Sequence, residues 1–424
     1  MTAYQRFVAA SGLTNLADGV AVVAWGWLAS LLTRDAVMIA LVPIALRSPW
    51  FLLALLAGIV TDRVDRRRLI LAMDAVRCVA FLAAALAIWA ALPLAAAPLH
   101  GVSDAGLYGM ILLAAAVVGG AEVFRDNAAQ TMLPALVPVA ALERANGRMW
   151  SVEMVGNALI GPALGAFLIG WALPLTFAVN ALAYGVAGVM VLRIAGSFRV
   201  PQTAARDWRA ELREGFGFLK ASPLLRTLAW TTGVWNLLHQ MTLIALVLHA
   251  QENLGLSAQM YGFVLAAGAV GGIAGGLFGG RVVQALGQAR TAQWMLASSA
   301  PAFAVMALAP NAWLLAAVFA VFEFTGLTWN IVSVSYRQRA IPDAMLGRVN
   351  SLYRLLAWGM MPVGLLLSGV IVMLAERPFS RPAALILPFW AAALGAAILT
   401  SGAWYPLERG FAAGGIAHAP DKMI

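Results

Sequence analysis

Gly58-Ile59-Val60-Thr61-Asp62-Arg63-Val64-Asp65-Arg66-Arg67-Arg68 is a short charged segment between two long apolar runs. Runs of that length can cross a bilayer as helices, so the charged segment is expected to be a tight loop at a membrane interface. Its arginines favour the cytoplasmic side, where basic loop residues concentrate. Asp62 can accept hydrogen bonds at the start of the next helix, where the helix dipole favours an anion. Gly58 is small enough to let two helices approach closely.

The composition of the whole chain indicates a membrane protein and excludes several other classes. Hydrophobic residues make up 62% of the chain and charged residues 11%, unlike a soluble globular protein. The net charge of +9 comes from arginines between apolar runs, which predicts positive-inside topology and no nucleic-acid partner. The single Cys78 excludes an internal disulfide and a cysteine metal cluster, and we expect no metal and no cofactor. Arg6 precedes an apolar run that is too long for a cleavable signal peptide.

Apolar segments long enough to span a membrane recur from one end of the chain to the other. Segments of about 20 to 25 residues fit a bilayer with some tilt. The predicted fold class is therefore an all-α polytopic membrane protein with twelve transmembrane helices. The predicted spans are about residues 8–32, 36–60, 69–92, 105–127, 145–170, 173–195, 224–250, 258–284, 291–309, 312–336, 347–374 and 382–405.

Basic residues concentrate in alternate loops, and this alternation predicts the orientation of the chain. Arginine-rich loops are assigned to the cytoplasm, whereas Arg34, Arg377 and Arg381 are the only basic residues in the opposite loops. The pattern predicts a multi-pass inner-membrane protein with both termini in the cytoplasm.

Two motifs carry a resemblance to a known family. Gly58-x-x-x-Asp62-Arg63-x-x-Arg66-Arg67 resembles the signature loop between helices 2 and 3 of the major facilitator superfamily, with Asp65 where glycine is frequent. Gly161-Pro162-x-x-Gly165-Ala166 resembles the fifth-helix signature of exporters in that superfamily. The chain looks most similar to the branch that holds drug–proton antiporters and the enterobactin exporter. The resemblance implies two pseudo-symmetric six-helix bundles, the major facilitator fold. The alternatives are an ordinary positive-inside loop and a kinked helix without a directional role.

Residues 196–223 are the longest connection in the chain and divide it into two halves. Trp208, Leu212, Phe216 and Leu219 recur at helical spacing, which predicts an amphipathic helix at the cytoplasmic interface. The expected division is a bundle at 1–195, the linker at 196–223, a second bundle at 224–405 and a cytoplasmic tail at 406–424. In the second half, Gly280 and Arg290 repeat the spacing of Gly58 and Arg68. Related halves are common in transporters that alternate their access.

Ionisable residues inside membrane spans are costly, so each of them is a functional candidate. Asp18 lies about ten residues into the first span, or roughly 15 Å of helical rise, near the membrane midplane. It is the first choice for proton coupling, with a structural carboxylate paired with arginine as the alternative. Arg47 is equally deep in the second span, and Asp18 or Glu122 are its candidate partners. The further proton-coupling candidates are Glu122, Glu153 and Glu323.

The remaining candidates are residues of the substrate cavity and of the cytoplasmic gate. By resemblance, spans 1, 4, 7 and 10 line the cavity. The cavity candidates are Asn15, Trp25, Arg47, Trp235, Asn236, His239 and Asn330. The gating candidates are Gly58, Asp62, Arg63, Arg66 and Arg67 in the loop, Asp74 and Arg77 as its braces, and Arg125 and Asp126 as a latch. Gly161, Pro162 and Gly165 form the exporter-type helix motif.

The sequence carries no nucleotide phosphate loop and no nucleophile with a plausible base, which favours a transporter driven by an ion gradient over an enzyme. The leading hypothesis is a monomeric, proton-coupled exporter of small amphipathic compounds in the lipid bilayer. A siderophore or metabolite exporter is the alternative within that class. A membrane sensor or assembly protein without transport activity is the alternative from another class.

Overall fold

The computed structural model describes residues 1–138, 142–199, 208–341, 349, 352–353 and 355–416. Of the described residues, 87% are helical and none is in a strand, so the all-α fold class is confirmed. Two compact units can be distinguished. Unit 1 comprises Met1–Ala204 together with Leu246–Ala266, and unit 2 comprises Ala205–Ala245 together with Ala267–Ile424.

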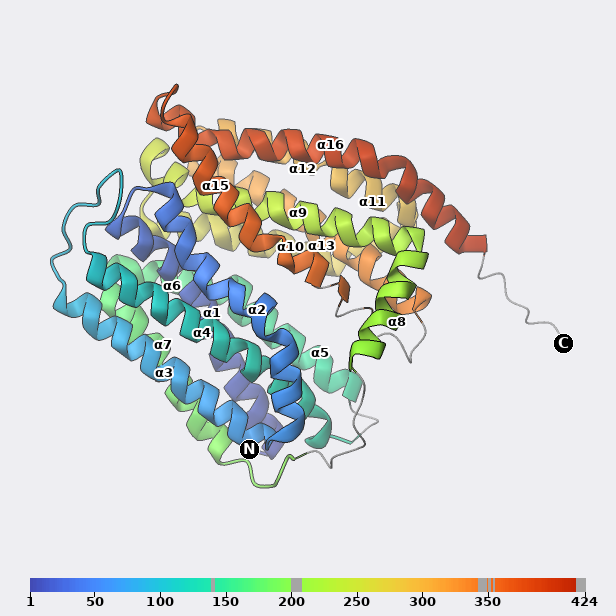
Figure 1. Ribbon diagram of the computed structural model, residues 1–424, viewed down its shortest axis with the longest axis horizontal. Helices are drawn as coiled ribbons and strands as arrows, with labels where there is room; N and C mark the ends of the chain where they lie inside the picture. The colour runs from blue at the N-terminus through green and yellow to red at the C-terminus, as the bar shows by residue number, and fades with distance from the viewer. Residues whose placement is uncertain (139–141, 200–207, 342–348, 350–351, 354, 417–424) are drawn as a thin grey trace. The chain divides into compact units, whose positions relative to one another are not determined.

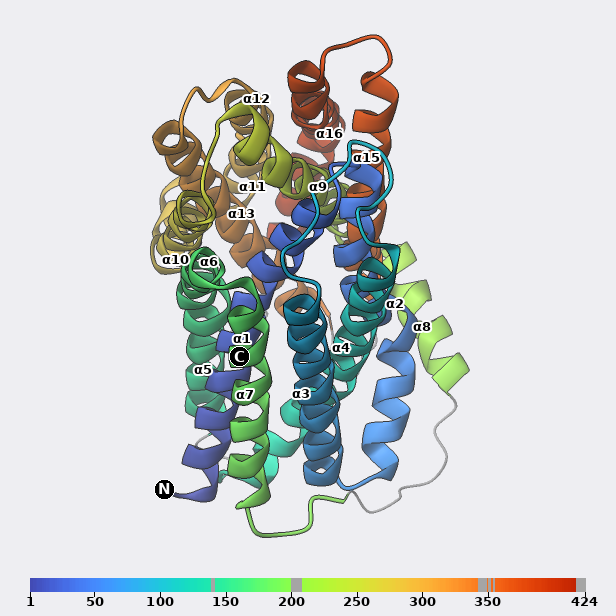
Figure 2. The same cartoon turned by 90° about the vertical axis from the view of Figure 1, so that its left-hand side faces the viewer.

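Unit 1 contains the helices of the first half of the chain, and Figures 1 and 2 show α1, α3, α4 and α7 running side by side. The closest packing joins α3 to α7 and α4, α2 to α4, and α1 to α6 and α7. The helices are α1 (Ala3–Leu32), α2 (Ala36–Arg63), α3 (Arg66–Ala90), α4 (Ala105–Met132), η1 (Leu133–Ala135), α5 (Leu142–Glu153), the π-helix η3 (Met154–Ile160), α6 (Gly161–Trp171) and α7 (Leu173–Leu192).

Four of these helices begin at a polar side chain that caps their free backbone N–H groups. Thr2 accepts from Gln5 N–H, Asp35 from Val37 and Met38, Asp65 from Arg68, and Asp104 from Leu107. Unpaired N–H groups near a bilayer are costly, so each cap defines where an apolar run can begin to be helical.

The exporter-type motif forms a close contact between α6 and α1. A Cβ atom at Gly161 would meet the backbone of Gly19, and one at Gly165 would lie 2.7 Å from the carbonyl oxygen of Val20. Pro162 has no N–H to donate, and the turns before it form the π-helix η3. Gly58, in contrast, has no atom within 4 Å of where a Cβ would be in the described part of the chain, so the predicted close approach at Gly58 is absent there.

Unit 2 contains most of the second half of the chain. Its helices are α8 (Trp208–Ala221), most of α9 (Pro223–Leu248), most of α10 (Ala258–Leu286), α11 (Gln288–Ala297), α12 (Ser299–Leu308), α13 (Ala312–Ala340), α15 (Met361–Ala375) and α16 (Arg381–Ile416). The helix predicted in the linker is present as α8, and its Leu219 is buried. Helix α16 continues past the predicted end of the last span because Ala403, Leu407 and Phe411 extend its buried face.

Eleven helices in the described part of the chain are long and apolar enough to cross a membrane. The predicted ninth span is instead divided into α11 and α12 by a turn at Ser298. Pro301 lacks the N–H that would bond to the Ala297 carbonyl, which explains the interruption. The two short helices together still cover the predicted segment.

Leu246–Ala266 belongs to the second half by sequence but packs in unit 1. This segment holds the end of α9, the π-helix η4 (His249–Asn253) and the start of α10. Gln251 accepts a hydrogen bond from Arg34 (2.6 Å) and donates one to Ser30 (2.8 Å). Glu252 lies 3.7 Å from Arg34, and the ring of Tyr261 lies 6.0 Å from that of Trp27. The segment is thus tied to the end of α1 by both polar and aromatic contacts.

Candidate functional site

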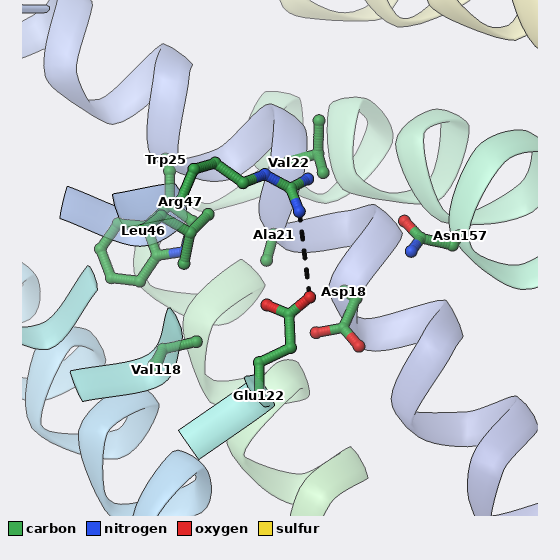
Figure 3. Close-up of a pocket in the computed structure, with 9 residues that line it drawn as sticks. All are labelled: Asp18, Ala21, Val22, Trp25, Leu46, Arg47, Val118, Glu122 and Asn157. Atoms are coloured by element: carbon green, nitrogen blue, oxygen red, sulfur yellow. Dashed lines mark ion pairs between the residues drawn. The ribbon is translucent and has the colours of Figure 1, made fainter. Parts of the chain in front are cut away.

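A small cavity in unit 1 brings together several of the predicted site residues. Its volume is about 10 Å³, close to the space that one water molecule needs. Charged side chains of α1, α2 and α4 point toward one another at its wall, as Figure 3 shows. The lining residues are Asp18, Ala21, Val22, Trp25, Leu46, Arg47, Val118, Glu122 and Asn157.

Asp18 is paired with Arg77 of α3. A carboxylate paired with arginine was the alternative to proton coupling that the sequence left open for Asp18. The Arg77 side chain is fully buried, whereas that of Asp18 is 18% exposed. The Tyr184 hydroxyl of α7 donates to Asp18 (2.7 Å) and accepts from Arg77 (2.8 Å), and the guanidinium carbon lies 4.1 Å from the Tyr184 ring centroid. A buried guanidinium needs this kind of closely matched partner set. The arrangement holds Asp18 rigidly at the cavity wall.

Glu122 of α4 is the second carboxylate at the cavity, and its contact is looser. The nearest carboxylate oxygen of Glu122 lies 3.9 Å from the Arg47 guanidinium. Of the two candidate partners of Arg47, Asp18 and Glu122, the structure therefore pairs it with Glu122. The Arg47 side chain is 40% exposed and that of Glu122 14%. A pair at this distance with one exposed member is easily broken. Glu122 can therefore change partners more readily than Asp18.

A second charged layer joins α3 to α4. Arg125 lies 3.4 Å from Asp74 and 3.6 Å from Asp126, and the side chains of Arg125 and Asp74 are almost completely buried. The predicted latch residues Arg125 and Asp126 therefore contact each other, and Arg125 also contacts α3. Asp74 and Arg77, predicted to brace the Asp62 loop, contact Arg125 and Asp18 instead. Arg77 lies eleven residues beyond Arg66, about 16 Å along the helix.

The charged loop at residues 58–68 is held by hydrogen bonds to the ends of other helices in unit 1. Arg66 donates to the carbonyl of Thr131 (2.7 Å) and Arg67 to that of Ile194 (2.6 Å), whereas Arg63 is exposed. The Asp62 side chain lies outside the described residues. Asp65 accepts hydrogen bonds from the N–H groups of Phe198 (2.8 Å) and Arg68 (3.0 Å).

Partial burial raises the pKa of Asp65, but hydrogen bonds from Phe198, Arg68 and Ser197 outweigh that effect. The pKa of Asp65 is therefore held below its ordinary value, and the carboxylate keeps its negative charge at the membrane interface. Asp65, which occupies the position where glycine is frequent in the signature loop, thus anchors the loop to the segment after α7.

The other predicted residues of unit 1 lie around the cavity or away from it. Trp25 lines the cavity and packs on Phe177, with ring centroids 5.0 Å apart. Asn15 donates to the carbonyl of Ser11 in its own helix (2.8 Å), and Glu153 is exposed on α5. Asn157, which the sequence analysis did not select as a cavity residue, lines the cavity from η3.

The predicted residues of the second half form a separate group in unit 2. His239 of α9 lies 3.2 Å from Glu323 of α13, and the His239 ring centroid lies 5.0 Å from that of Trp235. Asn236 is buried and donates to the carbonyl of Ala357 (2.9 Å), which indicates a structural contact. Asn330 is exposed on α13. Within unit 2, His239, Glu323 and Trp235 are therefore brought together, whereas Asn236 and Asn330 are not part of that group.

The sequence has clear matches among known proteins. The model of the Major Facilitator Superfamily matches residues 7–362. The multidrug efflux pump Tap of Mycolicibacterium fortuitum is 26% identical over 371 residues, which cover 83% of this chain and 85% of that protein. The enterobactin exporter EntS of Escherichia coli O1:K1 / APEC is 26% identical over 307 residues, or 70% of this chain and 68% of that protein.

Solved structures with the same fold are more distant in sequence. A bacterial homologue of the human lysosomal transporter Spinster, inward-facing and unoccupied, aligns with a TM-score of 0.75 at 13% identity, covering 97% of each chain. A bacterial homologue of the iron transporter ferroportin, in an inward-facing state, aligns with a TM-score of 0.72 at 13% identity, covering 96% of this chain and 98% of that one. At this identity the likeness concerns the fold alone.

Proposed function

Because the chain belongs to the major facilitator superfamily, we propose that it is a secondary active transporter that exports small amphipathic compounds in exchange for protons. The two relatives described above are an efflux pump and an exporter, which supports the direction of transport. The close α1–α6 contact through Gly161 and Gly165 fits the exporter-type motif that the sequence carries. The proposal includes a monomer in the inner membrane, with no enzymatic activity.

The observation that carries the proposal is the pair of carboxylates at one cavity. Asp18 is held by Arg77 and Tyr184, whereas the ion-pair partner of Glu122 in the described part of the chain is the distant, partly exposed Arg47. Protonation of Glu122 would release Arg47, and approach of Arg47 would favour loss of that proton. A water molecule in the cavity would suffice to pass the proton between solvent and carboxylate. Among the four predicted carboxylates, this geometry favours Glu122 as the proton carrier and Asp18 as its rigid neighbour.

Transport by inverted membrane vesicles tests the proposal. In inverted vesicles, export from the cell corresponds to uptake into the vesicle lumen. Vesicles that contain the protein should therefore accumulate fluorescent amphipathic compounds when their interior is acidic. The accumulation should stop when the pH gradient is collapsed with nigericin. Protein-free vesicles provide the control. Accumulation that needs ATP and ignores the pH gradient would contradict secondary transport.

Export of an anionic siderophore or metabolite is a second candidate function. Arg47 favours it because its side chain is 40% exposed beside the cavity and its guanidinium could bind an anion. One of the relatives exports enterobactin. The same inverted vesicles, incubated with an anionic siderophore in the outer solution in place of the amphipathic dyes, distinguish the two substrates. A sensor without transport activity would move neither class.

The orientation of the chain is a separate prediction. Reporter tags at Ser103 and Arg377 should be accessible from outside the cell, and tags at Arg206 and Lys422 from the cytoplasm. The physical reason is the concentration of arginine in alternate loops. Labelling of single introduced cysteines with a membrane-impermeant maleimide measures this, with the native Cys78 replaced by serine. Cytoplasmic labelling at Ser103 would overturn the topology.

A further inference from the structure

The pair of His239 and Glu323 in unit 2 is an ionisable site that the proposed proton carrier does not use. His239 Nε2 lies 3.2 Å from Glu323 Oε1. The two side chains are 16% and 28% exposed, so neither is fully buried. Ionisable groups within membrane spans are costly and are retained where they bind something. A partly exposed carboxylate whose ion-pair partner among the described residues is a histidine can accept another cation.

Aromatic rings border this pair on one side. Trp235 stacks on Phe322 with centroids 5.3 Å apart and an interplanar angle of 14°. The Trp235 indole N–H donates to Ser299 Oγ (2.9 Å), which fixes the ring. Gly326 leaves room for it, because a Cβ there would lie 3.0 Å from the indole. The ring of Trp235 lies next to His239, with centroids 5.0 Å apart. Aromatic rings together with a carboxylate are the groups that recognise an organic cation.

No other charged side chain of unit 2 competes at this position among the described residues. Ser299 and Phe303 of α12 and Gly268 of α10 are the neighbouring residues, and they carry no charge. On α9, α10 and α13 the positions at this site are His239, Gly268 and Glu323. Every other charged group on each of these helices is at least thirteen residues from that position, or about 20 Å along the helix. These distant groups are Arg226, Arg281, Arg337 and Arg339.

We propose that Glu323 binds the positively charged group of the exported compound, with Trp235 against its apolar body, and that protonated His239 competes with it for Glu323. This inference rests on the proposed function and names its substrate class as organic cations. Binding of one cation displaces protonated His239, which then loses its proton to solvent. The site stays neutral in both states, with Glu323 balanced either by His239 or by the ligand. Histidine is the residue type that changes charge between pH 5 and 8, the range in which this exchange would operate.

Equilibrium binding to the detergent-solubilised full chain tests this without any gradient. The probe is tetraphenylphosphonium, and tetraphenylborate serves as a probe of nearly the same shape with opposite charge. Because one proton is displaced, the Kd for tetraphenylphosphonium should fall by up to about tenfold per pH unit between pH 5.5 and 7.5. His239→Gln should abolish that pH dependence and bind at pH 5.5 as the parent protein does at pH 7.5. Glu323→Gln should weaken binding at least tenfold at pH 7.5.

Three outcomes would overturn the proposal. Unchanged cation affinity in Glu323→Gln would remove the carboxylate from the site. If the affinity of His239→Gln for tetraphenylphosphonium still depends on pH, the displaced proton belongs to another group. Tighter binding of tetraphenylborate, lost in His239→Gln, would make this an anion site. Glu408→Gln, an exposed carboxylate on α16, is the matched control and should bind as the parent protein does.

The assay separates this proposal from the proposed function. Binding is measured at equilibrium, so a protein that binds the cation in this way but fails to use a pH gradient in vesicles would contradict only proton-coupled export. Thermal unfolding and size-exclusion profiles of both variants establish that they are folded. If Glu323→Gln does not fold, the pH dependence in His239→Gln alone decides the question.

Discussion

Replacing Glu122 with glutamine is expected to abolish uphill export while leaving a folded protein that still binds its ligand. Glutamine matches the size of glutamate but neither takes up nor loses a proton. The Glu122–Arg47 contact is long, at 3.9 Å, and Arg47 is 40% exposed, so its loss should cost little stability. Accumulation in inverted vesicles should fall to the level seen without a pH gradient. Exchange of ligand down its own concentration gradient should persist.

A matched carboxylate distinguishes this expectation from a general effect of lost charge. Glu153 is exposed on α5 and was also predicted as a proton-coupling candidate. Glu153→Gln should retain uphill accumulation. The reverse pattern, with active Glu122→Gln and inactive Glu153→Gln, would move the proton site to α5. Loss of ligand binding in Glu122→Gln would make Glu122 a substrate contact instead.

Replacing Arg77 with methionine is expected to destabilise the protein more than any other single change at the site. Arg77 is fully buried, and its removal leaves Asp18 as an uncompensated charge beside Tyr184. Breaking a buried pair by removing one partner costs about 3–5 kcal/mol. The variant should lose most of its folded yield and show a clearly lower Tm in detergent.

The double variant Arg77→Met with Asp18→Asn provides the control. Removing both charges leaves neither Asp18 nor Arg77 as an uncompensated ion, so most of the lost stability should return. A double-mutant cycle of Tm values gives the coupling between the two residues. If the double variant is as unstable as the single one, packing of the Arg77 side chain, and not its charge, stabilises this region.

The helices were predictable from the sequence because membrane spans are read from long apolar runs. The exception is the predicted span at 291–309, in which Ser298 separates α11 from α12. Pro301 was visible in the sequence, but proline in a membrane helix is often accommodated without a break. Whether such a residue interrupts a helix depends on its neighbours in space.

The partners of the charged residues were only partly predictable. Arg47 was assigned two candidate partners from depth alone, and Glu122 is the one observed. Arg77 was grouped with Asp74 because the two lie one turn apart on α3, although it pairs with Asp18, 59 residues away. Tyr184 was missed because a single tyrosine in an apolar helix gives no signal of its role. Contacts between helices follow from packing, which helical periodicity does not specify.

The contact of residues 246–266 with α1 has a consequence for chimeras between related transporters. Exchange of halves at the linker would separate Ser30 and Arg34 from Gln251, since these residues are joined across that boundary. A hybrid built in this way places a foreign segment against the end of α1. A chimera should therefore take residues 246–266 from the same parent as the first half of the chain. Each exchanged part then coincides with a unit that packs as one body.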